Sequence, residues 1–316
     1  MKMSYLNILL NQELIPNLFF DECWMSISLD ERKEIIYSLF HINNWKSLEP
    51  QYRIYILQEL ENINASVQNR KPYRVVMKDN IDSSVQKGPE GSNEIQINSD
   101  YLLNGQRYAI TVGKDGKVQH HIKQLDNLNV ELFCSLCHEG EHVKQVQGIM
   151  ENLNTKEINE CCLNLLANPD DKGESNRISY YDDPILYKLQ PVEYYAFLHS
   201  ETMTREVFTM LQAKFGIDIG YVKWDERVRE NDFDILARKW NEDNNLKEDV
   251  GVEYTVLGIR KMIIQSMTQN VSKWYDVFDG YKFCGLDFLR DYSPNFREDW
   301  VHDSKGHDQT SSCRKL

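Results

Sequence analysis

The sequence lacks any long hydrophobic run. No stretch approaches the roughly 18 consecutive apolar residues that a membrane-spanning helix requires. The first twenty residues contain an apolar run, but Asn7, Asn11 and Gln12 interrupt this run and only one basic residue precedes it. Such a segment makes a poor signal peptide. We therefore expect a cytoplasmic protein, with export by a route that needs no cleaved signal as the alternative.

Positive charge is also scarce. The 316 residues include 36 Lys and Arg against 49 Asp and Glu, which gives a net charge of −13. Nucleic acid and anionic membrane surfaces would repel such a chain, so we expect neither as its main partner. With 41% hydrophobic and 27% charged residues, the composition is that of a folded soluble protein. The length allows one large domain or two to three smaller ones.

The chain has only seven cysteines, which is an odd number. The seven residues follow the spacing of no small secreted scaffold, so reduced thiols are expected. Cys161 and Cys162 are adjacent, which disfavours a disulfide between them.

The region 1–72 has the pattern of a helical hairpin. Ser28 is a candidate N-cap with Glu31 three positions later, which is the capping-box spacing. A second amphipathic pattern follows and breaks at Asn64. Trp45 lies in the connection and is expected to pack between the two helices.

Strand patterns occupy the next part of the chain. Residues 73–77 and 94–98 read as short strands, separated by a polar loop. Two runs of strand-forming residues flank Asp115-Gly116, which predicts a β-hairpin.

Helical periodicity dominates from Asn129 onward. It predicts helices over 129–147, 155–168, 190–216, 232–244 and 254–278, with Gly216 ending the third of them. The expected fold class is therefore α+β. The predicted segments are an N-terminal helical hairpin at 1–72, a core at 73–215, a C-terminal helical region at 216–300 and a disordered tail at 301–316.

Residues 138–142 fit the pattern H-E-x-x-H. On a helix, His138 and His142 project from one face a turn apart, so both imidazoles can reach one tetrahedral zinc ion. Glu139 lies about 100° round the helix, where it can act as general base on a water that the zinc activates. Glu141 points away from the histidines. The alternative is a solvent-exposed helix with incidental histidines, but Leu132, Leu136 and Val143 form an apolar stripe that favours a core helix.

A zinc ion held by two histidines needs a third protein ligand. The best candidate is Glu193, because Pro191 suits the first turn of a helix and holds the chain firmly there. Ala196, about one turn later, is small enough to let two helices approach closely. Four other residues compete for the role: His199, Glu201, Asp182 and Asp183.

The two cysteines beside the motif offer thiolates for a structural zinc site. Cys137, however, lies about 100° from His138 round the helix, and Cys134 lies a full turn closer to the N-terminus. One zinc cannot bind both thiols and both imidazoles on a straight helix. We therefore expect both cysteines to pack in the core.

The order of "NEIQIN", "ELFCSLCHEGEHVKQ" and "YKLQPVEYYAF" resembles a minimal zincin of the gluzincin type. More narrowly, it is similar to metallopeptidase domains of bacterial toxin-like and phage-associated proteins. The resemblance covers about residues 90 to 215, although the insertion between strand and helix is longer than in the most compact members. It implies zinc bound by His138, His142 and Glu193, with Glu139 as general base. It also implies that the strand at 94–98 is an edge strand that binds extended peptide substrates.

A peptidase site also needs a group that stabilises the oxyanion of the intermediate. Among the polar residues near Glu193, Tyr187 and His199 are the candidates for this role. The leading hypothesis is thus a zinc-dependent hydrolase, a peptidase acting on a peptide or protein substrate. Two alternatives stay open. One is an inactive zincin-like binding or regulatory protein, whose structural metal takes a fourth ligand such as Cys134 or His199. The other is a toxin-like effector.

Overall fold

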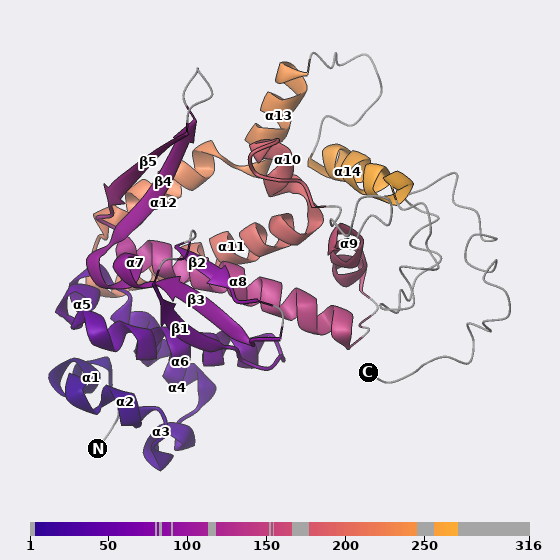
Figure 1. The fold of residues 1–316 in the computed structure, drawn as a ribbon. Coiled ribbons are helices and arrows are strands. Elements are labelled where there is room, and N and C mark those ends of the chain that lie inside the picture. The colour runs from indigo at the N-terminus through magenta and orange to yellow at the C-terminus, as the bar shows by residue number, and fades with distance from the viewer. Residues whose placement is uncertain are drawn as a thin grey trace, which may run out of the picture. The chain divides into compact units, whose positions relative to one another are not determined.

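The fold was analysed in a computed structural model (Figure 1). The structure describes residues 4–79, 81, 84–89, 91–112, 118–151, 153, 155–165, 177–244 and 256–270. These residues form a mixed α+β protein that is mostly helical and has two small sheets, which confirms the expected class at that level. The predicted tail at 301–316 lies outside the described residues. Among those described, no helix combines the length and the hydropathy needed to cross a membrane.

The chain divides into two compact units, each made of two stretches of sequence. Unit 1 comprises Met1–Lys144 and Ala196–Glu230, and unit 2 comprises Gln145–Tyr195 and Asn231–Leu316. Two long helices, α8 (Leu128–Met150) and α11 (Pro191–Phe215), run without a break through both units. The predicted segment boundaries at 72, 215 and 300 stay predictions.

Unit 1 begins with short helices that lead into a longer pair. They are α1 (Tyr5–Leu10), η1 (Gln12–Leu14), α2 (Ile15–Leu18), α3 (Glu22–Ser26), α4 (Leu29–Leu39), α5 (Ile42–Ser47), η2 (Pro50–Tyr52) and α6 (Arg53–Val67). The capping box of Ser28 and Glu31 is present at the start of α4, as predicted. Trp45 lies on α5, where its ring stacks on Phe40 at 5.0 Å and contacts the Arg53 guanidinium at 5.2 Å. It therefore packs between the ends of α4 and α6.

The sequence pattern suggested that the second helix ends at Asn64, but it does not. Helix α6 continues to Val67, and the Asn64 side chain is buried and donates a hydrogen bond to Cys137 Sγ at 3.4 Å. The amide finds a partner on α8, so a residue that weakens an isolated helix is accommodated here.

A three-stranded sheet lies beside α6 (Figure 1). Its strands are β1 (Arg74–Lys78), β2 (Val85–Lys87) and β3 (Glu94–Asn98), in the order β1-β3-β2. Strand β3 pairs with β1 in parallel and with β2 antiparallel. The expectation that residues 94–98 form an edge strand is therefore wrong. Strand β2, which sequence patterns missed within the polar loop, folds back along β3 and covers its second edge.

The predicted hairpin is confirmed in the strands β4 (Gln106–Val112) and β5 (Val118–Gln124), which pair antiparallel. Its turn at Asp115-Gly116 lies outside the described residues. Helix α7 (Ser99–Asn104) links the sheet to this hairpin and ends at Gly105, whose φ of 66° is left-handed.

The core of unit 1 gathers around α8. Leu132, Phe133 and Leu136 are fully buried, as the apolar stripe predicted. The Phe133 ring makes edge contacts with Phe40 and Phe208, at 5.1 and 5.6 Å between centroids. Helix α11 ends at Gly216, whose φ of 97° stops it as expected, and α12 (Ile219–Glu230) follows.

In unit 2, the described residues form the helices α9 (Lys156–Leu165), α10 (Pro184–Leu189), α13 (Phe233–Asp243) and α14 (Val256–Asn270) besides parts of α8 and α11. A buried ion pair joins two of them, since Arg260 Nη2 lies 2.6 Å from Glu160 Oε2. The Tyr195 hydroxyl donates to the same carboxylate at 2.9 Å, which ties α11 to this cluster. Helix α10 was not predicted from the sequence; the Asp183 side chain caps its N-terminus.

Candidate metal centre

Helix α8 brings the two histidines of the motif together. The imidazoles of His138 and His142 lie half-buried, with their ring centroids 4.7 Å apart and their Nε2 atoms 3.2 Å apart. Donor atoms at 2.0–2.2 Å from one tetrahedral zinc stand roughly 3.3–3.6 Å from each other. The spacing of the two Nε2 atoms is close to that range, as expected for an i, i+4 pair on a regular helix.

Glu193 lies in the first turn of α11 and is completely buried. A side chain of α8 fixes this turn, because Gln145 Nε2 donates to the carbonyl oxygen of Val192 at 3.0 Å. Asn164 Oδ1 accepts the N–H of Val192 at 3.1 Å. Gln145 follows His142 by three residues on the same helix, α8.

The three side chains form a cluster. The ligand atoms of His138, His142 and Glu193 all lie within 4.8 Å of one another. Two imidazoles and a carboxylate are a donor set that zinc binds in catalytic sites, with one position left open. The donor chemistry therefore fits a zinc ion.

Glu139 faces strand β2. Its Oε2 accepts the backbone N–H of Lys87 at 2.8 Å. The N–H of the next residue, Gly88, donates to the Glu94 carbonyl of β3. Because backbone groups alternate in direction along a strand, the N–H of Lys87 points away from β3 and is available to α8. The carboxylate is therefore held in a defined orientation by the edge of the sheet, a contact that no sequence pattern indicated.

Arg177 is a residue of the site that sequence reasoning missed. Its guanidinium forms an ion pair with Glu193 Oε1. The backbone beside Arg177 is fixed through the next residue, Ile178. The Gln190 side chain accepts the N–H of Ile178 and donates to its carbonyl oxygen, each at 2.9 Å. The one signal in the sequence was indirect: a buried carboxylate requires a positive partner.

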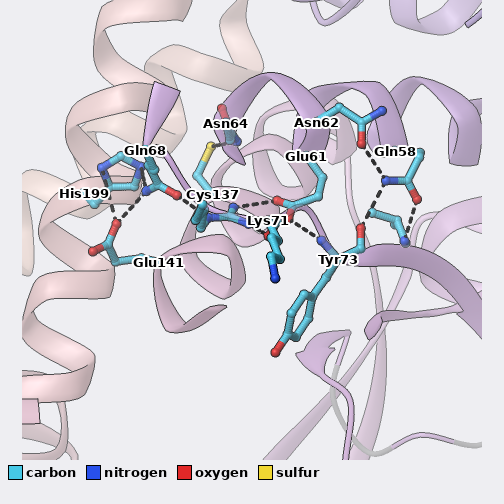
Figure 2. Close-up of polar contacts among 12 residues, drawn as sticks. Gln58, Glu61, Asn62, Asn64, Gln68, Lys71, Tyr73, Cys137, Glu141 and His199 are labelled. Atoms are coloured by element: carbon cyan, nitrogen blue, oxygen red, sulfur yellow. Dashed lines mark hydrogen bonds and ion pairs between the residues drawn. The ribbon is translucent and has the colours of Figure 1, made fainter. Parts of the chain in front are cut away.

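A buried polar network supports the motif helix from the side of α6 (Figure 2). Arg70 Nη2 donates to Glu61 Oε2 at 2.8 Å, and both side chains are almost fully buried. Arg70 Nε donates to Gln68 Oε1 at 2.6 Å, and Gln68 Nε2 donates to Glu141 Oε2 at 2.7 Å. Glu141 is therefore buried and paired on the α6 side of α8.

Gly140 allows this network to approach the helix. A Cβ atom at this position would lie 2.8 Å from Arg70 Nη2 and 3.3 Å from Glu61 Oε2. Both atoms belong to the buried ion pair, so neither can move aside cheaply. The middle residue of the motif is thus glycine because a buried guanidinium packs against it.

The two cysteines pack in the core, as expected. Cys137 is buried in the main hydrophobic cluster and Cys134 packs against that cluster. Burial raises the pKa of the Cys134 thiol to about 12, although hydrogen bonds with Thr204 and Ser200 oppose the rise. Burial also raises the pKa of Cys137. Both thiols are therefore protonated at neutral pH and are poor metal ligands in this state.

The remaining candidates lie in different surroundings. His199 Nε2 is 3.1 Å from Gln68 Nε2, and His199 Nδ1 is 3.8 Å from Glu141 Oε2 (Figure 2). Tyr187 lies on α10, with its ring edge-on to Tyr180. A role for His199 or Tyr187 as oxyanion stabiliser stays a prediction.

The acidic competitors of Glu193 are placed as follows. Asp183 caps α10 and accepts a hydrogen bond from Trp240 Nε1 at 3.0 Å. Asp182 is exposed in the turn before α10, and Glu201 is buried on α11. The described residues contain one candidate metal cluster, and of these carboxylates only Glu193 belongs to it.

Comparison of the chain with protein-family models, curated proteins and solved structures found no match. Function must therefore be inferred from the residues of the site.

Proposed function

We propose that the chain is a zinc-dependent hydrolase and, more specifically, a peptidase built on a zincin-like core. The observation that carries the proposal is the cluster of His138, His142 and Glu193, with Glu139 next to the first histidine on α8. The core would consist of the β1-β3-β2 sheet, the motif helix α8 and the Glu-bearing helix α11.

Each residue has a distinct role in this proposal. His138, His142 and Glu193 would hold the zinc, which supplies a Lewis acid that acidifies water and polarises a carbonyl group. Glu139 would accept a proton from the water and deliver it to the leaving amine. The Lys87 N–H holds the Glu139 carboxylate in place, so this proton transfer starts from a preorganised group.

In this proposal, the strand that would bind an extended peptide substrate is β2 and not β3. Because β3 has neighbours on both sides, it cannot pair with an extended peptide. Strand β2 forms an outer edge of the sheet, and its Lys87 faces the general base. We infer that a peptide substrate would lie along β2 and pair with outward backbone groups other than the Lys87 N–H, which donates to Glu139.

Two observations favour catalysis over a structural metal. The residues considered as a fourth ligand have other contacts: His199 contacts Gln68 and Glu141, and Cys134 packs against the hydrophobic core. An open fourth position is the arrangement found in catalytic zinc sites.

Metal content tests the proposal directly. Purified protein is expected to carry about one zinc per chain, and His138→Ala and His142→Ala are expected to lose most of it, because two ligands cannot retain the ion as three do. Atomic absorption on dialysed protein measures this. His199→Ala is the matched control and should keep its zinc. If His138→Ala binds as much zinc as the unaltered protein, the proposed site is wrong.

Arg177 provides a second test that does not depend on activity. In metal-free protein it compensates the buried charge of Glu193, a task that zinc would share once bound. Arg177→Ala is therefore expected to lower the free energy of unfolding by about 1–2 kcal/mol in the presence of a chelator and by clearly less with zinc. Urea unfolding under both conditions measures the difference. Equal losses in both would show that zinc does not reach Glu193.

A further inference from the structure

A pocket in unit 1 lies outside the candidate metal centre. Its volume is about 520 Å³, which is within the usual range of small-molecule sites. The walls come from α5, the end of β5, the segment before α8, the connection after α11, and α12. The proposed hydrolase function uses none of the residues that line it.

Positive charge gathers around this pocket, although the chain as a whole carries a net charge of −13. Lys46, Lys123, Lys223 and Arg227 line it. Within the part of the chain that the structure describes, the ammonium groups of the three lysines form no ion pair or hydrogen bond. Arg227 pairs with Glu131 at 2.7 Å. Three exposed lysines at one concave site thus form no ion pair with the described residues.

The carboxylates in the lining do not neutralise these lysines. Asp218 is buried, and its two oxygens accept hydrogen bonds from the Tyr221 N–H at 3.2 Å and from Asn129 Nδ2 at 2.9 Å. Asp126 is the second carboxylate of the lining. Because Arg227 is paired with Glu131 and Asp218 is engaged within the fold, three lysines are left facing one carboxylate, Asp126.

The pocket also has an apolar part. Ile217 and Ile219 flank Asp218 and are 72% and 60% exposed. Ile42 and Leu125 contribute further apolar lining, and the buried Trp224 also borders the pocket. Exposed isoleucines beside the three lysines suit a ligand that has an apolar portion and an anionic group.

We propose that this pocket binds a small amphiphilic anion, in which a phosphate or carboxylate group is attached to a short apolar chain. The lysines would attract and bind the anionic group, and the isoleucines would cover the apolar chain. A concave site with an excess of one sign of charge focuses the local potential, so it can attract anions even on an acidic protein.

Calorimetric titration of the full chain tests this proposal with four probes: hexyl phosphate, hexanoate, inorganic phosphate and hexanol. Hexyl phosphate or hexanoate, or both, should bind, and which of them does identifies the anionic group. Inorganic phosphate and hexanol should bind much more weakly, because each lacks one of the two features. If neither amphiphile binds, or if inorganic phosphate binds as tightly as hexyl phosphate, the proposal is overturned.

Charge reversals localise the site. Lys46→Glu, Lys123→Glu and Lys223→Glu are each expected to weaken binding of the amphiphile by about fivefold to tenfold. Lys239→Glu on α13 makes the same change in net charge at an exposed position outside the pocket and should leave the affinity nearly unchanged. Equal weakening by Lys239→Glu would mean that only the overall charge matters, and the pocket would be excluded as the site.

Discussion

Glu139→Gln is expected to keep its zinc and lose peptide hydrolysis by about 10²–10⁴-fold, the contribution typical of a positioned general base. The glutamine amide has nearly the same shape, and its oxygen can still accept the N–H of Lys87. It cannot accept the proton of the attacking water. Initial rates on a peptide library, measured beside zinc content, separate loss of chemistry from loss of metal.

The matched control is Glu151→Gln, the same change at an exposed residue just beyond the end of α8. It should hydrolyse peptides at the unaltered rate. Full activity in Glu139→Gln would remove this residue from the mechanism. Loss of zinc in the same variant would instead assign Glu139 to the metal, against the geometry of the helix.

Arg70→Met is expected to have the largest effect on stability, lowering the free energy of unfolding by about 3–5 kcal/mol. Arg70 is the buried counterion of Glu61, whose carboxylate also accepts the N–H of Tyr73 at 2.9 Å (Figure 2). Without the guanidinium, a negative charge stays buried with no positive partner. Urea unfolding followed by circular dichroism measures the loss.

Two further variants separate the buried charge from lost packing. The double variant Glu61→Gln with Arg70→Met should recover part of the stability, because no unpaired charge is then left in the core. Arg229→Met is the matched surface control: its partner Asp225 is on the same helix, and its side chain is 71% exposed. That change should leave the free energy of unfolding almost unchanged. If the double variant is as unstable as Arg70→Met, packing rather than charge accounts for the effect.

Short elements were predicted less well than long ones. Helices α8, α9, α11 and α13 were all expected, because each carries a helical pattern through ten or more residues. Strand β2 has only three residues within a polar loop, and these residues form a strand only because they pair with β3. Helix α12 also went unpredicted. Asp218 caps its N-terminus by accepting the N–H of Tyr221, but only the fold brings Asn129 to the other oxygen of that carboxylate.

The sequence alone determined the part of the candidate site that lies on one helix. His138, Glu139 and His142 are related by the geometry of α8, and Gly216 ends α11 by its own left-handed conformation. These features depend on near neighbours in the chain, so their spacing is enough to predict them.

Only the tertiary structure decided what surrounds the motif. It placed Glu193 within reach of the histidines, paired Glu193 with Arg177, and held Glu139 with the N–H of Lys87. It also put β3 at the centre of its sheet rather than at the edge. Each of these arrangements brings together segments that are distant in sequence. The physical reason is that buried charges and strand edges must find partners, and the local pattern of a chain does not say which distant segment supplies them.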